Sequence, residues 1–221
     1  PSEKPKPLSQ AQQEAYNNIV FQFLKKRVVL LHGVTSSGKT EVYIHLINKA
    51  LTEKKQVLYL LPEIALTVQM TSRLKRVFGN KLGIYHSRYS DAERVEIWKK
   101  QLSTSPYEVI LGARSAVFLP FQRLGLVIID EEHEGSFKQQ DPAPRYHARS
   151  VAIVLAQMYG AKTLLGTATP SIESYRNAQL GKYGLVNLSQ RYKDIQLPAI
   201  EVVDIKDLRR RKIMSGPFSP R

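Results

Sequence analysis

Short apolar runs alternate with longer amphipathic stretches along most of the chain. The apolar runs, which predict buried β-strands, cover 28–32, 56–61, 82–85, 108–111, 126–129 and 162–165. Stretches with helical periodicity lie at 9–24, 39–53, 65–77, 90–102 and 147–159. Such an alternation predicts an α/β fold, in which a mostly parallel sheet has helices on both faces. One more strand candidate lies at 200–205.

The two ends of the chain are polar and differ from its middle. The start is rich in proline, and a run of basic residues at 209–212 lies near the other end. A chain of 221 residues, 43% of them hydrophobic, is long enough for one full α/β core. We therefore expect one domain over 8–205, preceded by a linker remnant over 1–7 and followed by a basic linker over 206–221.

Composition limits the class of binding partner and the cellular compartment that we expect for the protein. The 33 Lys and Arg against 19 Asp and Glu give a formal charge of +14, which favours a polyanionic partner such as nucleic acid. The absence of cysteine excludes disulfides and Cys-based zinc sites from these residues. No apolar run approaches the roughly 20 residues that a membrane span needs, and the start lacks the apolar segment of a signal peptide. We expect a cytoplasmic protein with no membrane partner.

The most specific motif is a complete GxxxxGK[ST] sequence after the first apolar run. It consists of Gly33, Val34, Thr35, Ser36, Ser37, Gly38, Lys39 and Thr40. The glycines let backbone N–H groups surround phosphate oxygens, and the following helix points its positive dipole end at the same anion. Lys39 would then reach the β and γ phosphates, and Thr40 would hold a Mg²⁺ ion. We expect ATP and Mg²⁺ to bind here; a plain glycine-rich turn is the alternative.

A second motif follows a later apolar strand, at the carboxyl edge where parallel sheets bind ligands. Asp130 is placed there to hold Mg²⁺, and Glu131 to orient and deprotonate the attacking water. A solvated acidic turn is the alternative, but the P-loop upstream favours catalysis, so Lys39, Asp130 and Glu131 are the expected catalytic residues. A zinc protease is excluded, because HExxH from His133 needs a histidine where Phe137 stands.

Five sequence blocks occur in the order of the superfamily 2 helicase motifs I, Ia, Ib, II and III. They are GVTSSGKTEVY, LLPEIALT, GARSAVFLP, DEEH and GTATPS. From residue 8 to about residue 204 the chain resembles the PriA family of primosomal replication-restart DNA helicases. The resemblance implies the first RecA-like lobe of a P-loop, ATP-dependent 3′ to 5′ DNA helicase that acts at stalled replication forks and starts primosome assembly.

The resemblance also implies parts that lie outside these residues. In this class ATP is hydrolysed between two lobes, and the second lobe supplies arginine fingers. The family also has a zinc-binding insertion, and its partners include primosome and single-strand-binding proteins. We expect the present lobe to bind ATP, to hydrolyse it very slowly and not to unwind DNA alone. The alternatives are another P-loop nucleic-acid-dependent ATPase, a P-loop kinase or metabolic ATPase, and a non-catalytic nucleic-acid-binding module.

Further nucleotide-site candidates rest on the resemblance. Gln12 resembles the glutamine that recognises adenine before motif I, although Ser9 and Gln12 also fit a capping box, and one side chain cannot easily do both. Thr167 and Thr169 follow a strand and are expected to touch the turn that contains His133. These three are candidate couplers between motifs II and III, although threonine is also common in such turns.

DNA contacts, to single strands and forks, are expected from loops at the same edge of the sheet. Short polar side chains and backbone amides of motifs Ia and Ib suit phosphate contacts. The segment 137–149 mixes aromatic, basic and proline residues, which suits stacking on unpaired bases, and resembles the aromatic-rich loop that links DNA sensing to ATP hydrolysis in PriA and RecQ-type helicases. The alternatives are a helix N-cap at Thr67, a surface Arg114 and a loop that packs its own aromatics. The DNA-binding candidates are Thr67, Arg114, Ser115, Lys138, Arg145, Tyr146 and Arg149.

Overall fold

The strands form one parallel sheet. The computed structural model describes residues 3–86, 88–190 and 205–211. Its strands are β1 (Val28–Gly33), β2 (Gln56–Leu60), β3 (Leu82–Tyr85), β4 (Val109–Gly112), β5 (Leu124–Asp130), β6 (Lys162–Thr167) and β7 (Gly184–Leu188). They form a seven-stranded sheet in the order β3-β4-β2-β5-β6-β1-β7, and each neighbouring pair is parallel. The predicted α/β fold with a parallel sheet is confirmed.

Helices connect the strands. They are α1 (Gln10–Lys25), α2 (Lys39–Thr52), α3 (Val68–Phe78), α4 (Asp91–Leu102), α5 (Ala148–Met158), α6 (Ile172–Gln179) and α7 (Ile205–Arg210). Four short 3-10 helices lie in the connections: η1 (Glu63–Ala65), η2 (Gly79–Lys81), η3 (Arg114–Phe118) and η4 (Gly135–Phe137). Together with the strands, the first five helices confirm the predicted pattern, whereas α6 and β7 were not predicted.

The tail differs from its prediction where the structure describes it. The candidate strand at 200–205 is wrong at its last residue, because Ile205 begins the helix α7, and 200–204 lie outside the described residues. In the basic run, Arg209 and Arg210 belong to α7, and Lys212 again lies outside the described residues. The boundaries expected for the linkers and the domain stay predictions.

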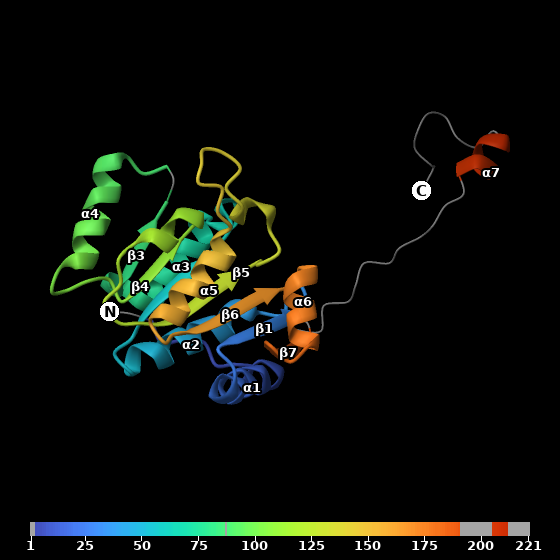
Figure 1. Cartoon of the computed structure of the whole chain (residues 1–221). Coiled ribbons are helices and arrows are strands. Elements are labelled where there is room, and N and C mark those ends of the chain that lie inside the picture. Colours follow the sequence, from blue (N-terminus) through green and yellow to red (C-terminus); the bar gives the residue numbers. More distant parts are fainter. Residues whose placement is uncertain (1–2, 87, 191–204, 212–221) are drawn as a thin grey trace.

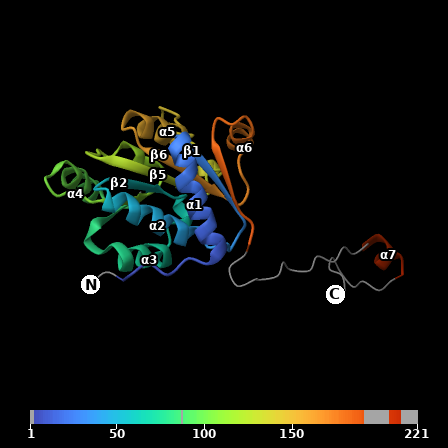
Figure 2. The same cartoon turned by 90° about the horizontal axis from the view of Figure 1, so that it is seen from below.

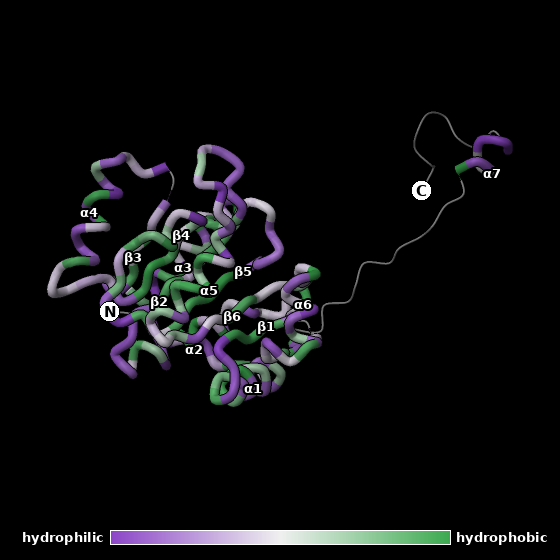
Figure 3. The backbone as a smooth tube through the Cα atoms, in the orientation of Figure 1, coloured by the Kyte–Doolittle hydropathy of each residue, from purple (hydrophilic) through white to green (hydrophobic). Residues whose placement is uncertain are grey.

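Helices cover both faces of the sheet. Figure 2 shows α1, α2 and α3 below the sheet and α5 above it. Successive strand residues point to opposite faces, so Val29 and Leu31 pack in the core on the α1–α3 side, whereas Val28 and Leu30 pack in the core on the α5 side. Figure 3 shows the result, with apolar residues concentrated along the central strands and polar residues in the outer loops.

Small and polar residues set how the helices dock and begin. Ala148, Ala152 and Ala156 recur every fourth residue along α5 and are all buried, so this helix packs closely on the sheet. Ser90 caps α4 in a capping box with Glu93, which fixes where that helix begins. Within the residues that the structure describes, none of the helices is both long and apolar enough to cross a membrane.

Strand register brings three motif-bearing strand ends together. The arrowheads of β5 and β6 point to the same side in Figure 1. In the sheet, His32 of β1 pairs with Thr167 of β6, and Asp130 of β5 pairs with Gly166 of β6. Since β6 lies between β1 and β5, the P-loop after β1 and the acidic turn after β5 flank the motif III segment at one sheet edge.

Candidate nucleotide and nucleic-acid site

The P-loop is a tight turn between β1 and α2. Ser36 and Gly38 adopt left-handed backbone conformations, with φ of 62° and 77°, which reverse the chain before α2. Lys39 folds back over this turn, and its Nζ donates a hydrogen bond of 2.9 Å to the carbonyl of Gly33. A Cβ atom at Gly33 would lie 3.0 Å from the Lys39 side chain, so glycine there leaves room for the lysine.

Two features of the turn fit a bound phosphate. The Ser37 hydroxyl is buried and has no hydrogen-bond partner among the described residues, although buried polar groups normally have one. The amino end of α2 receives no side-chain capping bond from the part of the chain that is described. Both the hydroxyl and the backbone N–H groups of a helix start suit phosphate oxygens.

Gln12 ties α1 to the P-loop. Its Oε1 accepts a 2.9 Å hydrogen bond from the Ser9 backbone, and Ser9 Oγ accepts one of 3.3 Å from the Gln12 backbone, so the capping-box alternative is confirmed. Its Nε2 donates to the carbonyls of Ser37 and Gly38 at 3.2 and 3.3 Å. The whole amide is engaged in these contacts, and contact with adenine stays a prediction.

Asp130 is a buried carboxylate at the end of β5. The hydroxyls of Tyr43 and Tyr59 donate hydrogen bonds to its two oxygens, at 2.9 and 3.3 Å. Burial raises its pKa to about 6, repulsion from Glu131 adds to the rise, and Tyr43 and Lys39 oppose it. The effect of Lys39 on this pKa places the P-loop lysine within electrostatic range of the acidic turn.

Glu131 lies in a turn with a left-handed backbone. Its φ is 49°, and its N–H donates a 3.1 Å hydrogen bond to Asp130 Oδ1. Its carboxylate is about one-third exposed (36%), and one oxygen lies 3.7 Å from the His133 ring. An exposed carboxylate beside the buried Asp130 is available to a water molecule, as a general base must be.

Motifs II and III meet through His133. Its Nδ1 lies 2.7 Å from Thr167 Oγ1, and its Nε2 lies 3.4 Å from Thr169 Oγ1. Thr167 also accepts a 3.0 Å hydrogen bond from the Thr169 backbone. The structure therefore brings these three residues together as expected, and their coupling role stays a prediction.

Glu132 is a functional candidate that the sequence reasoning missed. Its side chain is fully buried (0% exposed) and accepts hydrogen bonds from Arg149, Ser171 and Ser174. The backbone N–H of Ser171 adds a fourth, at 2.7 Å. The carboxylate thus joins the acidic turn to the starts of α5 and α6. Strand patterning carries no signal for this role, because Glu132 follows the last residue of β5.

The structure places Arg149 in this network. Its Nη1 donates to Glu132 Oε2 and to Ser171 Oγ, each at 2.6 Å, and only 13% of its side chain is exposed. A guanidinium that balances a buried carboxylate cannot turn to a DNA phosphate without leaving that charge unpaired. The structure thus shows a structural contact for Arg149, and DNA binding by this residue stays a prediction.

The loop 137–147 is held in place by hydrogen bonds from its own basic side chains and by contacts with η3. Arg114 Nη1 donates to the carbonyls of Ser136 and Lys138 at 3.2 and 3.1 Å. Lys138 in turn donates to the carbonyl of Arg145. The Tyr146 ring packs edge-on against Phe118 of η3, with 4.9 Å between centroids. One aromatic ring of the loop is therefore packed against η3, while the Arg145 side chain is exposed.

The remaining DNA candidates lie on neighbouring connections. Thr67 is the N-cap of α3, where its Oγ1 accepts a 3.2 Å hydrogen bond from Met70, so the capping alternative is confirmed. Ser115 lies in η3 beside Arg114. DNA binding by these side chains stays a prediction.

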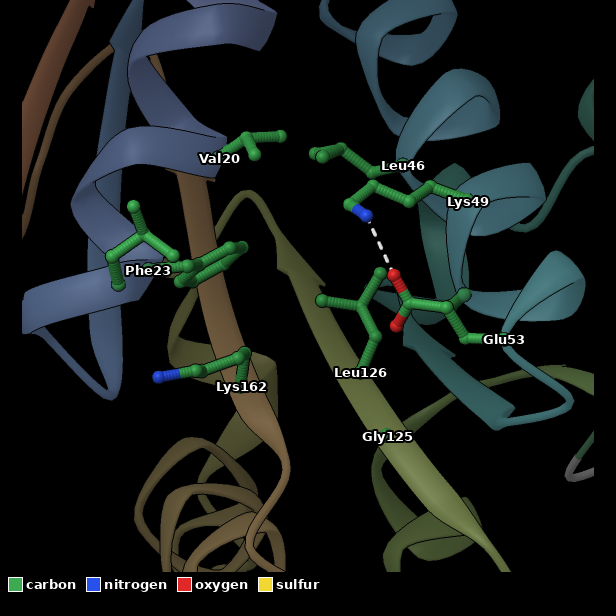
Figure 4. Close-up of a pocket in the computed structure, with 10 residues that line it drawn as sticks. Val20, Phe23, Leu46, Lys49, Glu53, Gly125, Leu126 and Lys162 are labelled. Atoms are coloured by element: carbon green, nitrogen blue, oxygen red, sulfur yellow. Dashed lines mark hydrogen bonds and ion pairs between the residues drawn. The ribbon is translucent and has the colours of Figure 1, made fainter.

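A cavity of about 280 Å³ lies away from this edge. Figure 4 shows it between α1, which contributes Val20 and Phe23, and α2, which contributes Leu46. Leu126 and Lys162, at the amino ends of β5 and β6, form its floor. The cavity therefore opens at the edge of the sheet opposite to the P-loop and is no part of the nucleotide site.

The family model for the DEAD/DEAH box helicases matches residues 9–178, from the start of α1 to α6. The chain belongs to the DEAD/DEAH box helicase family. The match includes the P-loop, the acidic turn and the motif III segment, so this DEAD/DEAH box domain is a helicase lobe.

Curated relatives narrow the resemblance. The chain is 43% identical over 206 residues to the replication restart protein PriA of Bacillus subtilis (strain 168), which covers 92% of this chain and 25% of that protein. It is 48% identical over 176 residues to PriA of Rickettsia felis, which covers 80% of this chain and 27% of that protein. The PriA resemblance is confirmed, and the chain spans about a quarter of the length of these relatives.

Solved structures confirm the RecA-like helicase fold. RecG bound to a three-way DNA junction superimposes with a TM-score of 0.60, at 21% identity over 87% of this chain and 25% of that one. Mycobacterium smegmatis helicase Lhr bound to ssDNA and AMP-PNP gives a TM-score of 0.58, at 18% identity over 83% of this chain and 26% of that one. At these identities the likeness concerns the fold.

Proposed function

We propose that the chain is the ATP-binding lobe of a 3′ to 5′ DNA helicase that acts at stalled replication forks in replication restart and primosome assembly. One observation carries the nucleotide part: Tyr43, one turn after Lys39 on α2, donates a 2.9 Å hydrogen bond to Asp130, and the buried hydroxyl of Ser37 in the P-loop has no partner among the described residues. That edge offers a cation, a carboxylate and free donors, as a magnesium nucleotide requires.

The residues present fit Mg-ATP. Thr40 and Asp130 are the proposed Mg²⁺ ligands, and the described ranges hold no cluster of three His, Cys, Asp or Glu residues that could bind a metal. Mg²⁺ commonly binds through one or two protein ligands together with substrate phosphates, so this small donor set suits it. The ion would neutralise charge on the phosphates, Lys39 would bind their oxygens, and Glu131 would accept the proton of the attacking water.

The DNA part rests on the loop and on the relatives. Arg145 is exposed on the loop 137–147, and the chain carries a formal net charge of +14, which favours a polyanionic partner. The loop follows the acidic turn directly, and its other end leads into Arg149, which contacts Glu132 of that turn. A change in the loop can therefore reach the turn by two routes, one along the backbone and one through the ion pair between Arg149 and Glu132.

The replication-restart role comes from the PriA relatives. The family resemblance extends the proposal to a cytoplasmic location, to primosome and single-strand-binding partners, and to a second lobe that completes the ATPase site. The lobe alone would bind ATP without unwinding DNA.

Calorimetric titration of the chain with ATP, in Mg²⁺ and in EDTA, tests the nucleotide part. We expect ATP to bind more tightly in Mg²⁺ than in EDTA. Single-stranded DNA should not displace the bound ATP. A chain that binds DNA but shows no Mg²⁺-dependent affinity for ATP would be a non-catalytic nucleic-acid-binding module.

A further inference from the structure

Two tyrosines from different elements hold the carboxylate of Asp130. Tyr43 lies on α2, one turn after the P-loop, and Tyr59 lies on β2. Tyr43 donates to Oδ1 at 2.9 Å and Tyr59 to Oδ2 at 3.3 Å, so each oxygen has its own phenol. The two rings pack edge-to-face, with centroids 5.6 Å apart. This geometry fixes both the position and the rotation of the carboxylate.

A glycine of motif III makes room for one of these phenols. A Cβ atom at Gly166 would lie 1.8 Å from the Tyr43 hydroxyl and 3.5 Å from Asp130 Oδ1. A side chain at that position would therefore displace the hydroxyl from the carboxylate. Motif I, motif II and motif III thus meet at a single hydrogen bond between Tyr43 and Asp130.

Packing alone does not account for two tyrosines here. Both side chains are fully buried, and a buried hydroxyl stabilises the fold only when it has a partner, whereas phenylalanine would fill nearly the same space with no such demand. Their shared partner is the carboxylate that faces the P-loop lysine.

We propose that Tyr43 and Tyr59 are positioning residues that hold Asp130 in the orientation in which it binds the magnesium ion of Mg-ATP. The inference rests on the proposed function, which makes Asp130 a magnesium ligand. Groups that hydrogen-bond to a metal ligand commonly change metal affinity by about 10- to 100-fold when they are removed. Without the two phenols, the carboxylate of Asp130 would be free to rotate and would no longer be held in the orientation that binds the ion. The P-loop itself would not change.

The test measures nucleotide affinity with and without the ion. The chain and its Tyr43→Phe and Tyr59→Phe variants are titrated with a non-hydrolysable ATP analogue, once in Mg²⁺ and once in EDTA. We expect unchanged affinity in EDTA, and a gain from Mg²⁺ that is about 10-fold smaller in each variant than in the original chain. Tyr159→Phe is the matched control, because it removes a phenol that donates at 2.8 Å to the carbonyl of Phe121, before β5. It should keep the full gain.

The outcomes separate positioning from packing. Equal loss of affinity in Mg²⁺ and in EDTA would assign both rings to the core and overturn the proposal. In an Asp130→Asn background, either Tyr→Phe change should have no further effect on the gain from Mg²⁺, and independent, additive losses would also overturn it. An original chain with no gain from Mg²⁺ would instead reject the proposed function, whatever the variants do.

A second experiment tests the same contact without removing the hydroxyl of Tyr43. 3-Fluorotyrosine introduced at position 43 retains the hydroxyl and the packing, and its ¹⁹F resonance reports on the contact with Asp130. We expect the resonance to move on addition of Mg²⁺ with nucleotide and to stay unchanged with nucleotide in EDTA. The same shift under both conditions would show that the phenol responds to phosphate alone, contrary to the proposal.

Discussion

The acidic turn after β5 and the loop 137–147 treat their charged groups in opposite ways. In the turn, Glu132 is buried and accepts four hydrogen bonds, one of them from Arg149. In the loop, Arg145 is exposed, and its Nε donates to a backbone carbonyl, that of Gln140 at 2.7 Å. The turn is therefore fixed by the pairing of buried charges. In the loop, by contrast, the basic side chain of Arg145 can give up its hydrogen bond to a backbone carbonyl and bind a phosphate at a small cost in free energy.

The largest expected effect, on the free energy of unfolding, comes from removing the ion pair between Glu132 and Arg149 in the acidic turn. Glu132→Ala removes the buried carboxylate that lies 2.6 Å from the guanidinium of Arg149, and removing one partner of a buried ion pair costs about 3–5 kcal/mol. Urea denaturation should show this loss in the free energy of unfolding. Glu173→Ala is the control, since that carboxylate is largely exposed and lies 3.8 Å from Arg149. Its loss should stay below about 1 kcal/mol; equal losses in the two variants would contradict the comparison.

The next effect concerns pH in the metal-free chain. Asp130 has a pKa of about 6 in the folded state against its ordinary value of 3.8, so the folded state binds the proton more tightly. Stability is therefore unaffected by this group below pH 3.8 and falls as the pH rises through the window up to about 6, by about 3 kcal/mol in total. Asp130→Asn removes this dependence.

Urea denaturation at pH 4 and pH 7 in EDTA measures that prediction. The stability of the Asp130→Asn variant, relative to the original chain, should increase between the two pH values. A difference that does not change with pH would mean that burial leaves the carboxyl at its ordinary pKa.

A smaller effect is expected for the P-loop lysine. Lys39→Ala removes a charged donor to the phosphates, and such hydrogen bonds contribute about 1.5–3 kcal/mol. Calorimetry should show a corresponding loss of affinity for Mg-ATP. Lys49→Ala changes a lysine of the same helix that pairs with Glu53 at the opposite edge, and it should bind as the original chain does. Comparable losses in both would indicate a general effect of charge.

The smallest effect tests the loop. In the longer protein, Arg145→Ala should weaken DNA-stimulated ATPase more than basal ATPase, because the proposed contact of this exposed side chain is with DNA and not with the nucleotide. The salt dependence of single-strand binding should also decrease, by about 0.7 in the slope of log affinity against log salt. Arg123→Ala, before β5 at the other edge, is the control. Equal loss of stimulated and basal activity would show that Arg145 supports the fold and does not sense DNA.

Local sequence pattern was enough to predict most of the fold and the position of the P-loop turn between β1 and α2. Apolar runs identified six of the seven strands, because a parallel sheet buried on both faces leaves continuous hydrophobic stretches. The strand β7 was missed because its pattern alternates, with Asn187 exposed on an edge strand. The short helix α6 was missed since it buries little apolar surface, and Ile172 at its start is exposed.

The partners within the site depend on tertiary neighbours and carry no such pattern. Tyr59 reaches Asp130 across 71 positions of sequence, and Arg149 reaches Glu132 across 17. A tyrosine in a buried strand is usually a packing residue, and an arginine after an aromatic loop suggests DNA. Only the distances between atoms distinguish those interpretations from the contacts that the structure shows.

The contact between Gln12 and the P-loop makes α1 part of the nucleotide pocket, although it precedes motif I along the chain. The amide holds the carbonyls of Ser37 and Gly38, and a Cβ atom at Gly38 would lie 2.3 Å from its nitrogen. A lobe shortened to begin at β1 would keep the residues of the P-loop but lose this brace. Substitutions in α1 can therefore change the conformation of the P-loop from outside it, through the amide of Gln12.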